Sequence, residues 1–343
     1  MYVISWQQQS LYPSIFACAF SFHTKESYVN YLALFASMAD IVPSQENQSL
    51  HADYGKILDT YGNEYAIPEY TIKQIRDAIP PACFDRSAIR SLSYVLRDLL
   101  LIASTYLLAV KYITPNLIPN FWLRSVLWSI YGFLNGIFGT GLWVLAHECG
   151  HQAFSPSKRL NDTVGFILHS ALLVPYFSWK LSHAKHHQST GHMSRDVGFV
   201  PRTRQEFAAR VGVSLERLSE VCEDAPLHTL VYIVMRQLLG WPIYLLTNDS
   251  GHNYFGGEDR KSESSQLVNG LRYGVNHFNP GSPIFDAKDA RLIIISDLGL
   301  LAAGTLIKLG ANRYGWANML IWYFLPYVWI NSWLGTFDVS TSS

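Results

Sequence analysis

Apolar residues in this chain are gathered into runs long enough to cross a lipid bilayer. A spanning helix needs roughly 20 mainly apolar residues, and such runs occupy residues 99–113, 121–146, 292–309 and 316–335. Pro115 and Pro119 lie between the first two runs, and the sequence GANRYG lies between the last two. The pattern therefore predicts an all-α integral membrane protein with four transmembrane helices in two hairpins.

Small residues are spaced along the second run at Gly132, Gly136, Gly139 and Gly141. Small side chains let the backbones of membrane helices approach each other closely. We therefore expect a neighbouring helix to pack tightly against this face.

Two further apolar runs are less suited to crossing the bilayer. Residues 164–179 are a short run that contains His169 and Pro175, and residues 229–246 have Arg236 near their centre. An arginine at the middle of a bilayer costs about 3 kcal/mol on insertion scales. We expect both runs to be re-entrant or interfacial, with a complete span over 229–246 as the alternative.

Composition agrees with a membrane protein. Hydrophobic residues make up 49% of the 343 residues and charged residues only 15%, whereas soluble proteins average about 25% charged residues. The formal net charge is zero, so nothing indicates a nucleic-acid partner. The four cysteines contain no C-x-x-C pair, which argues against a disulfide framework or a cysteine zinc site and fits a reducing, cytosolic face.

Basic residues indicate the orientation. Nine Lys and Arg residues lie within 147–228, whereas the two hairpin tips hold few. Cytosolic loops carry an excess of Lys and Arg, so we expect 147–228 and both termini to be cytosolic. No Lys or Arg precedes Lys25, which argues against a secretory signal; residues 1–60 are interpreted as an N-terminal arm.

Histidines form two clusters that could hold a metal. The first is His147-Glu148-Cys149-Gly150-His151, and the second is SHAKHH, which contributes three more histidines: His183, His186 and His187. Residues three or four positions apart share one face of a helix. The sequence therefore predicts five imidazoles on two helical faces, while His23, His51, His169 and His228 are interpreted as structural or surface residues.

The first cluster matches the H-E-x-x-H motif of zinc metalloproteases, in which two histidines bind zinc and the glutamate acts as base. The extended form of that motif needs Gly and His where this chain has Phe154 and Ser157, and no Glu lies between Glu148 and Glu206 to supply a third ligand. A zinc protease would also leave the second cluster unexplained. A dinuclear non-haem iron site uses both clusters, since imidazole suits iron as well as zinc, and Glu148 then supports the ligands instead of acting as a base.

Longer stretches carry a family resemblance. AHECGH followed by HAKHH resembles the histidine boxes of membrane fatty-acid desaturases, and HSALLVPYFSWKLSHAKHH, LLGWPIYLLTN and GVNHFNPGSPIF are similar to the fungal Δ12 (oleoyl) branch. The likeness runs from about residue 67 to about 334. We accordingly expect a desaturase domain over 61–335 and an unrelated polar tail over 336–343.

The resemblance implies an activity. Enzymes of this family hold two irons on the cytosolic face of the endoplasmic reticulum membrane and receive electrons from cytochrome b5 and its reductase. They use O₂ to remove two hydrogens from an acyl chain in a bent tunnel. The implied substrate is an oleoyl chain on phospholipid or CoA, and the implied product is linoleoyl.

The sequence also departs from the family pattern. The family has a third box, H-x-x-H-H, and a further histidine, whereas no histidine follows His277 here, and Ser332 stands where the fungal group has His. Asn248 and His252 have a ligand-compatible spacing and are weak candidates to substitute. Five strong ligands shared between two irons would leave both under-coordinated, so we expect too little bound iron for turnover. An active Δ12 desaturase, an inactive membrane protein that retains the fold, and a hydroxylase or ω3 desaturase on the same scaffold all stay open.

Overall fold

The computed structural model describes residues 70–201, 226–252 and 274–340, with 204–205, 208, 214, 216, 267–268 and 271–272. The chain divides into two units, Met1–Asp85 and Arg86–Ser343. In the first unit, α3 (Ile72–Ala78) begins at a Thr71–Gln74 capping box and is followed by the short helix η1 (Pro81–Phe84). The N-terminal arm predicted over 1–60 lies outside the described residues.

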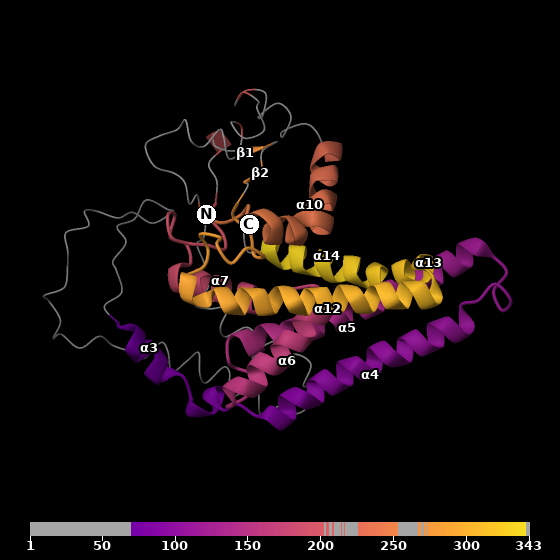
Figure 1. Cartoon of the computed structure of the whole chain (residues 1–343), viewed down its shortest axis with the longest axis horizontal. Helices are drawn as coiled ribbons and strands as arrows, with labels where there is room; N and C mark the ends of the chain where they lie inside the picture. The colour runs from indigo at the N-terminus through magenta and orange to yellow at the C-terminus, as the bar shows by residue number, and fades with distance from the viewer. Residues whose placement is uncertain are drawn as a thin grey trace, which may run out of the picture. The chain divides into compact units, whose positions relative to one another are not determined.

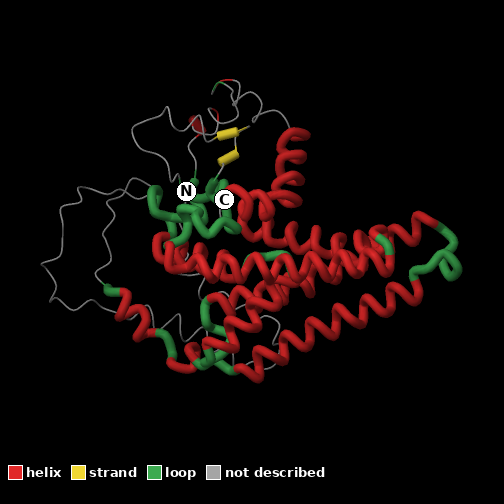
Figure 2. The backbone as a smooth tube through the Cα atoms, viewed as in Figure 1, coloured by secondary structure: helices red, strands yellow, loops and turns green. Residues whose placement is uncertain are grey.

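The second unit is built from helices, as the sequence predicts (Figures 1 and 2). Among its described residues, the only strands are a two-residue antiparallel pair, β1 (Leu267–Val268) and β2 (Leu271–Arg272). The helices, in chain order, are α4 (Ala88–Tyr112), α5 (Phe121–Gly150), α6 (Lys158–Ala171), α7 (Tyr176–Ser189), α10 (Pro226–Thr247), η2 (Ala287–Asp289), α12 (Ala290–Tyr314), α13 (Trp316–Met319), the π-helical turn η3 (Leu320–Phe324) and α14 (Leu325–Ser340).

Both predicted hairpins are present. The first joins α4 to α5 through residues 113–120, and the side chain of Asn120 caps α5 by accepting a hydrogen bond from the N–H of Leu123 at 3.0 Å. The second turns at Gly315, whose φ of 90° lies in the region that favours glycine. Gly315 is thus the one residue between the end of α12 and the start of α13.

Four helices among the described residues are long and apolar enough to cross a membrane: Ala88–Tyr112, Phe121–Gly150, Thr229–Thr247 and Ala287–Tyr314. The number agrees with the sequence prediction, but one member differs. Residues 229–246 form most of the continuous helix α10, so length and composition favour the alternative of a complete span there. The run over 316–335 is instead divided among α13, η3 and α14. Pro242 lies inside α10 and the helix bends (Figure 1), because proline removes one hydrogen bond of the helix without always ending it.

The apolar run over 164–179 does not form one straight helix. Helices α6 and α7 are bent by 110° at a short break, as in a broken span or a re-entrant loop. Leu173 adopts a left-handed φ of 55° at the break, and Pro175 is the N-cap residue of the next helix. This bend agrees with the re-entrant or interfacial expectation and turns α7 back toward the end of α5.

Helix α5 is the central helix of the unit, with α4, α6, α7 and α14 packed around it. Its predicted close approach is to α14: a Cβ added at Gly136 would lie 2.3 Å from Cβ of Trp329, and one added at Gly139 would lie 2.5 Å from Ile330. Gly141 faces the other neighbour, where an added Cβ would lie 2.7 Å from the buried Asp98 of α4. The glycine spacing thus serves two helix interfaces.

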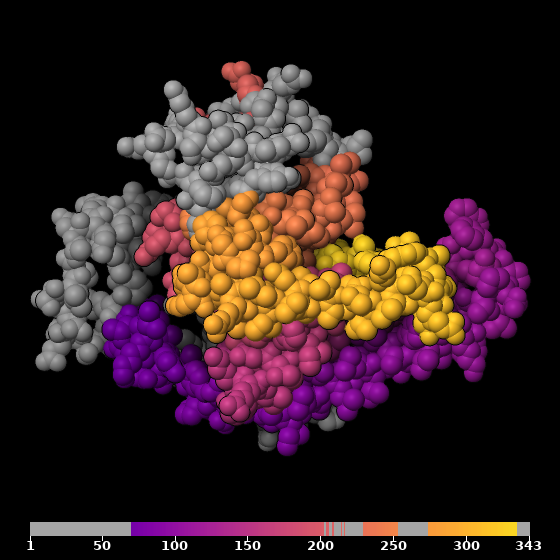
Figure 3. Space-filling view, in the orientation of Figure 1, coloured from indigo at the N-terminus to yellow at the C-terminus, as the bar shows by residue number. Residues whose placement is uncertain are grey.

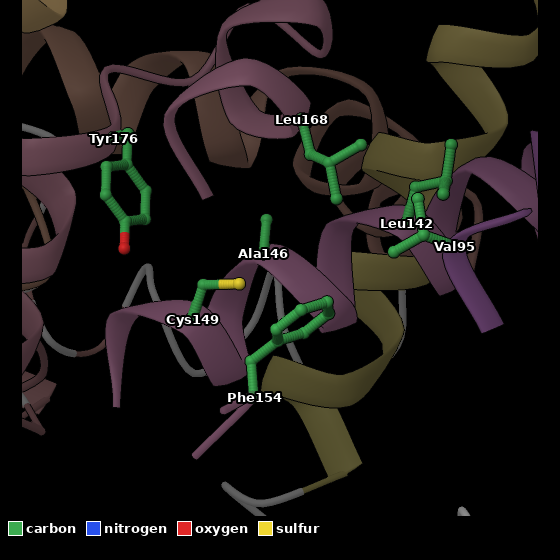
Figure 4. Packing of buried hydrophobic residues seen from close by; sticks show 7 residues of the cluster. All are labelled: Val95, Leu142, Ala146, Cys149, Phe154, Leu168 and Tyr176. Atoms are coloured by element: carbon green, nitrogen blue, oxygen red, sulfur yellow. The ribbon is translucent and has the colours of Figure 1, made fainter. Parts of the chain in front are cut away.

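A buried cluster fixes the end of α5 that carries the first histidine box (Figure 4). It joins side chains from α4, α5, α6 and α7 and the loop after α5: Val95, Leu142, Ala146, Cys149, Phe154, Leu168 and Tyr176. Fully burying a large apolar side chain contributes about 1.5–3 kcal/mol. The cluster therefore holds the four helices in place beside the histidines.

Helix α12 supports α7 from outside. It packs along α6 and α7, and its side chains form a continuous surface with those of α6 in the space-filling view (Figure 3). Pro175 gives α7 no side-chain cap. Instead, Oγ of Ser296 on α12 accepts hydrogen bonds from the N–H groups of Phe177 and Ser178 at 2.8 and 3.3 Å, so a distant helix caps the helix of the second box.

Candidate metal centre

Four imidazoles meet where the end of α5 approaches α7. The Nε2 atoms of His147 and His151 are 2.8 Å apart, and those of His151 and His183 are 3.2 Å apart. Nε2 of His187 lies 3.0 Å from Nε2 of His183. One ring nitrogen from each of His147, His151 and His183 lies within 4.8 Å of the other two. The fold therefore brings the two predicted boxes together.

The distances between these nitrogen atoms suit ligands that bind one shared metal ion. Imidazole nitrogens bind such ions at about 2.1 Å, so adjacent ligands of one octahedral or tetrahedral ion stand about 3.0–3.4 Å apart. The observed separations of 2.8–3.2 Å lie close to that range. Nitrogen donors of this kind suit iron, zinc and copper.

The protonation state of the cluster also suits a metal. Loss of hydration among the packed rings, together with the neighbouring His187, lowers the pKa of His151 to about 4. At neutral pH this imidazole is neutral, and a neutral imidazole has the lone pair that a metal needs.

A layer of tryptophans lies against the imidazoles. Trp179 stacks on His183 with ring centres 4.4 Å apart and also contacts His147 at 5.1 Å. Trp143 contacts His147 at 5.5 Å, and Trp241 of α10 packs against Trp143. These indole rings form an aromatic wall on the buried side of the cluster.

Among the five histidines of the two boxes, His186 is the one whose described hydrogen bond is to a carboxylate and not to another imidazole. Its Nδ1 lies 2.5 Å from Oδ1 of Asp196, and both side chains are buried. Burial raises the pKa of Asp196, but the bonds from His186 and from the N–H groups of Gly198 and Phe199 outweigh it and hold that pKa below its ordinary value. Asp196 is thus an ionised acceptor for His186.

Glu148 lies between the two histidines of α5. Its Oε1 is buried and has no hydrogen-bond partner among the described residues. A base or a supporting acceptor would both use this atom, so the role of Glu148 stays a prediction.

The described contacts of the weaker candidate His252 are with Asp196. The Nδ1 atom and the backbone N–H of His252 both lie 3.0 Å from the carbonyl oxygen of Asp196. Asn248 is fully buried with a left-handed φ of 46°, and its amide atoms have no hydrogen-bond partner among the described residues. Their assignment as metal ligands stays a prediction.

Several residues around the centre were not predicted from the sequence, because they are not metal ligands of the two boxes. Trp143 and Trp179 each precede a box histidine by four residues, so the spacing that places the histidines on one face also places an indole beside each. That signal is readable in the sequence. His277 is also buried, with its ring nitrogens 3.1 Å from the hydroxyl of Ser182 and 3.3 Å from the carbonyl of Leu245, and no local pattern predicts those contacts.

Comparison with known proteins supports the same interpretation. The fatty acid desaturase family profile matches residues 120–342. The chain is 53% identical over 283 residues to an oleate hydroxylase of Claviceps purpurea, covering 82% of this chain and 59% of the relative. It is 41% identical over 281 residues to a Δ12 fatty acid desaturase of Mortierella isabellina, covering 80% and 65%. An ω6 fatty acid desaturase, endoplasmic reticulum, of Brassica juncea is 38% identical over 267 residues, covering 78% and 62%.

The chain thus spans about three fifths of the length of these relatives. The region that the family profile matches contains both histidine boxes and three of the four candidate membrane helices. The fourth, Ala88–Tyr112, lies just before it. The chain belongs to the fatty acid desaturase family.

Proposed function

We propose that this chain carries part or all of a non-haem iron centre that oxidises the acyl chain of a membrane lipid. The observation that carries the proposal is the convergence of His147, His151 and His183 within a helical membrane scaffold of the desaturase family. By resemblance the centre holds two irons, with His186 and His187 as further ligands.

Iron bound there would supply, with O₂, the oxidising power to break C–H bonds of an unactivated methylene. Desaturation converts –CH₂–CH₂– to –CH=CH– and, with two electrons and two protons, reduces O₂ to two waters. The chain's own residues position the ligands and limit access of water. Trp143 and Trp179 close the buried side of the cluster, and the bend between α6 and α7 presents the second box to the first. Holding the substrate to within about 1 Å matters, because nothing in a methylene directs the reaction.

The first candidate reaction is Δ12 desaturation of an oleoyl chain to linoleoyl. It is supported by the Δ12 desaturases at about 40% identity. The acyl carrier, phospholipid or CoA, and the bent acyl tunnel are expectations from the same resemblance. Two apolar grooves of about 400 and 430 Å³ lie along α5 with α14 and along α4, away from the histidines, so neither is that tunnel.

The second candidate is hydroxylation of the same chain, and one observation favours it. The oleate hydroxylase of Claviceps purpurea is 53% identical to this chain, against 41% for the Mortierella isabellina desaturase. Hydroxylation needs the same iron, O₂, two electrons and two protons, but it inserts one oxygen atom into a C–H bond and releases one water. The two reactions therefore differ in how the oxidised methylene is held and not in the metal ligands.

We place the centre on the cytosolic side of the endoplasmic reticulum membrane, with cytochrome b5 and its reductase as electron donors. Support comes from the basic residues of 147–228 and from the Brassica juncea relative, which is named as an endoplasmic reticulum desaturase. The donors follow from the family resemblance.

Expression of the chain in yeast, with gas chromatography and mass spectrometry of the acyl chains, tests the proposal. Linoleate identifies the desaturase, a hydroxylated oleate identifies the hydroxylase, and both products must disappear in a His147→Ala, His151→Ala variant. If the purified chain binds iron but forms neither product, the result would support the alternative of an inactive membrane protein that retains the fold. A chain that binds no iron would overturn the metal-centre proposal itself.

A further inference from the structure

The loop after α7 contains a buried carboxylate that is hydrogen-bonded to α7 and to the backbone of its own loop. Asp196 is 1% exposed. Its Oδ1 accepts hydrogen bonds from Nδ1 of His186 and from the N–H groups of Gly198 and Phe199, and its Oδ2 accepts one from the N–H of Gly191.

The backbone of the same residue reaches a second segment. The carbonyl oxygen of Asp196 accepts hydrogen bonds from the backbone N–H and from Nδ1 of His252, each at 3.0 Å. Close by, the hydroxyl of Ser250 donates to the carbonyl of Gly198 at 2.6 Å, and the N–H of Val200 donates to the carbonyl of Ser250 at 2.7 Å. Hydrogen bonds therefore join the loop after α7 to the turn after α10.

Gly198 lets this unit close on the imidazole. A Cβ added at Gly198 would lie 2.7 Å from both Cγ and Nδ1 of His186. Any larger residue would push the ring away from Asp196, so the absence of a side chain is what allows the backbone N–H of Gly198 and the ring of His186 to share one carboxylate oxygen.

The chemistry of the contact determines which nitrogen of His186 faces away. Both carboxylate oxygens of Asp196 accept backbone N–H groups, as an acceptor-only carboxylate does. In this arrangement Nδ1 of His186 is the donor of the pair. Nε2 then carries the lone pair, and it is also through Nε2 that His183 and His187 contact the other imidazoles. A metal-bound imidazole typically donates its second N–H to a carboxylate, which fixes its orientation and raises its basicity.

We infer that Asp196 is a positioning residue that orients His186 for metal binding, with Gly198 and His252 holding Asp196 in place; this inference rests on the proposed metal centre. It assigns His252 a role in support of the site in place of ligation. The ring of His186 lies beside the cluster, with its centre 5.9 Å from that of His183 and 5.7 Å from that of His187.

A double-mutant cycle tests the inference on the purified full chain. Co²⁺ serves as the probe, because its visible absorption reports both affinity and coordination, and thermal unfolding without metal reports folding. Asp196→Asn should weaken Co²⁺ binding about 10–100-fold and change the visible spectrum. His186→Ala should weaken binding at least as much, and the double variant should bind no more weakly than His186→Ala alone.

Asp286→Asn is the matched control, since Asp286 is an exposed aspartate whose Oδ1 pairs with Lys185 at 3.2 Å; its Co²⁺ affinity should match that of the unaltered chain. Should Asp196→Asn fail to fold, Gly198→Ala replaces it in the same cycle, because it displaces His186 while leaving Asp196 intact. Unchanged affinity in these variants, or losses that multiply in the double variant, would overturn the inference. Absence of Co²⁺ and iron binding in the unaltered chain would instead overturn the metal centre.

Discussion

The Nε2 atoms of His151 and His183 lie 3.2 Å apart, although 32 residues separate them in the chain. This contact joins the two histidine boxes, which stand on different helices. It exists because α6 and α7 are bent by 110° and because Gly150 lets α7 come close: a Cβ at that position would lie 2.9 Å from the ring of Trp179.

Replacing His183 with alanine should remove a central member of the cluster. Its Nε2 contacts both His151 and His187, so we expect bound iron per chain, measured by elemental analysis, to fall about 10-fold or more. His192→Ala is the control, since the recorded ring contacts of His192 are with Ser194 in its own turn. Equal iron content in the His183 variant and the unaltered chain would contradict the assignment.

Replacing Ser296 with alanine should loosen the start of α7. The hydroxyl of Ser296 is the acceptor for the N–H groups of Phe177 and Ser178, and loss of a helix cap costs about 0.5–2 kcal/mol. Chemical unfolding in detergent micelles should show a loss in that range. Thr305→Ala on the same helix should stay within about 0.5 kcal/mol, because its exposed hydroxyl bonds only to the carbonyl of Leu301 in its own helix; equal losses would argue against the capping role.

Replacing Gly136 with alanine should separate α5 from α14. The new Cβ would lie 2.3 Å from Cβ of Trp329, a contact that only a backbone shift can relieve. We expect a loss of about 1–3 kcal/mol in the free energy of unfolding. At Gly304 in α12 an added Cβ meets nothing within 4 Å, so Gly304→Ala should be neutral or stabilising by up to about 1 kcal/mol. A neutral Gly136 variant would show that the two helices do not pack this closely.

Acidification should destabilise the fold through His277. Burial lowers the pKa of His277 to about 4, against 6.5 for an ordinary histidine, although its contact with the carbonyl of Leu245 opposes the shift. As the pH falls, the unfolded chain protonates His277 before the folded chain does, and this favours unfolding. The contribution of neutral, buried His277 to the free energy of unfolding is therefore complete above pH 6.5 and is lost as the pH falls from 6.5 toward 4. The total is roughly 3 kcal/mol, at about 1.4 kcal/mol for each unit of pKa.

The free energy of unfolding, measured between pH 7 and 4.5, should therefore fall less steeply in a His277→Gln variant than in the unaltered chain. The variant is expected to be less stable at pH 7, since Ser182 and Leu245 lose their partner. Parallel pH curves for the two chains would exclude His277 as the titrating group.

Much of the architecture could be predicted from local patterns. Apolar runs of spanning length predicted the two hairpins, because a bilayer requires a fixed length of helix. Spacings of three and four residues predicted that the histidines of each box share a face, since the helical repeat decides that within a single turn. Arg236 favoured a re-entrant or interfacial segment over 229–246, whereas the helix formed there is long and apolar enough to span a membrane and contains Pro242. No sequence window shows the bend of that helix.

The sequence by itself thus determined which residues could bind a metal and that the chain is a helical membrane protein. Tertiary structure alone decided how those residues combine: that His151 and His183 meet, that Ser296 caps a helix 118 residues away in the chain, and that Asp196 takes the second nitrogen of His186. Helix formation and burial depend on short-range periodicity, which a sequence displays directly. Contacts between distant segments depend on bend angles and on close approaches at glycines such as Gly150 and Gly198, and these arise only when the helices pack.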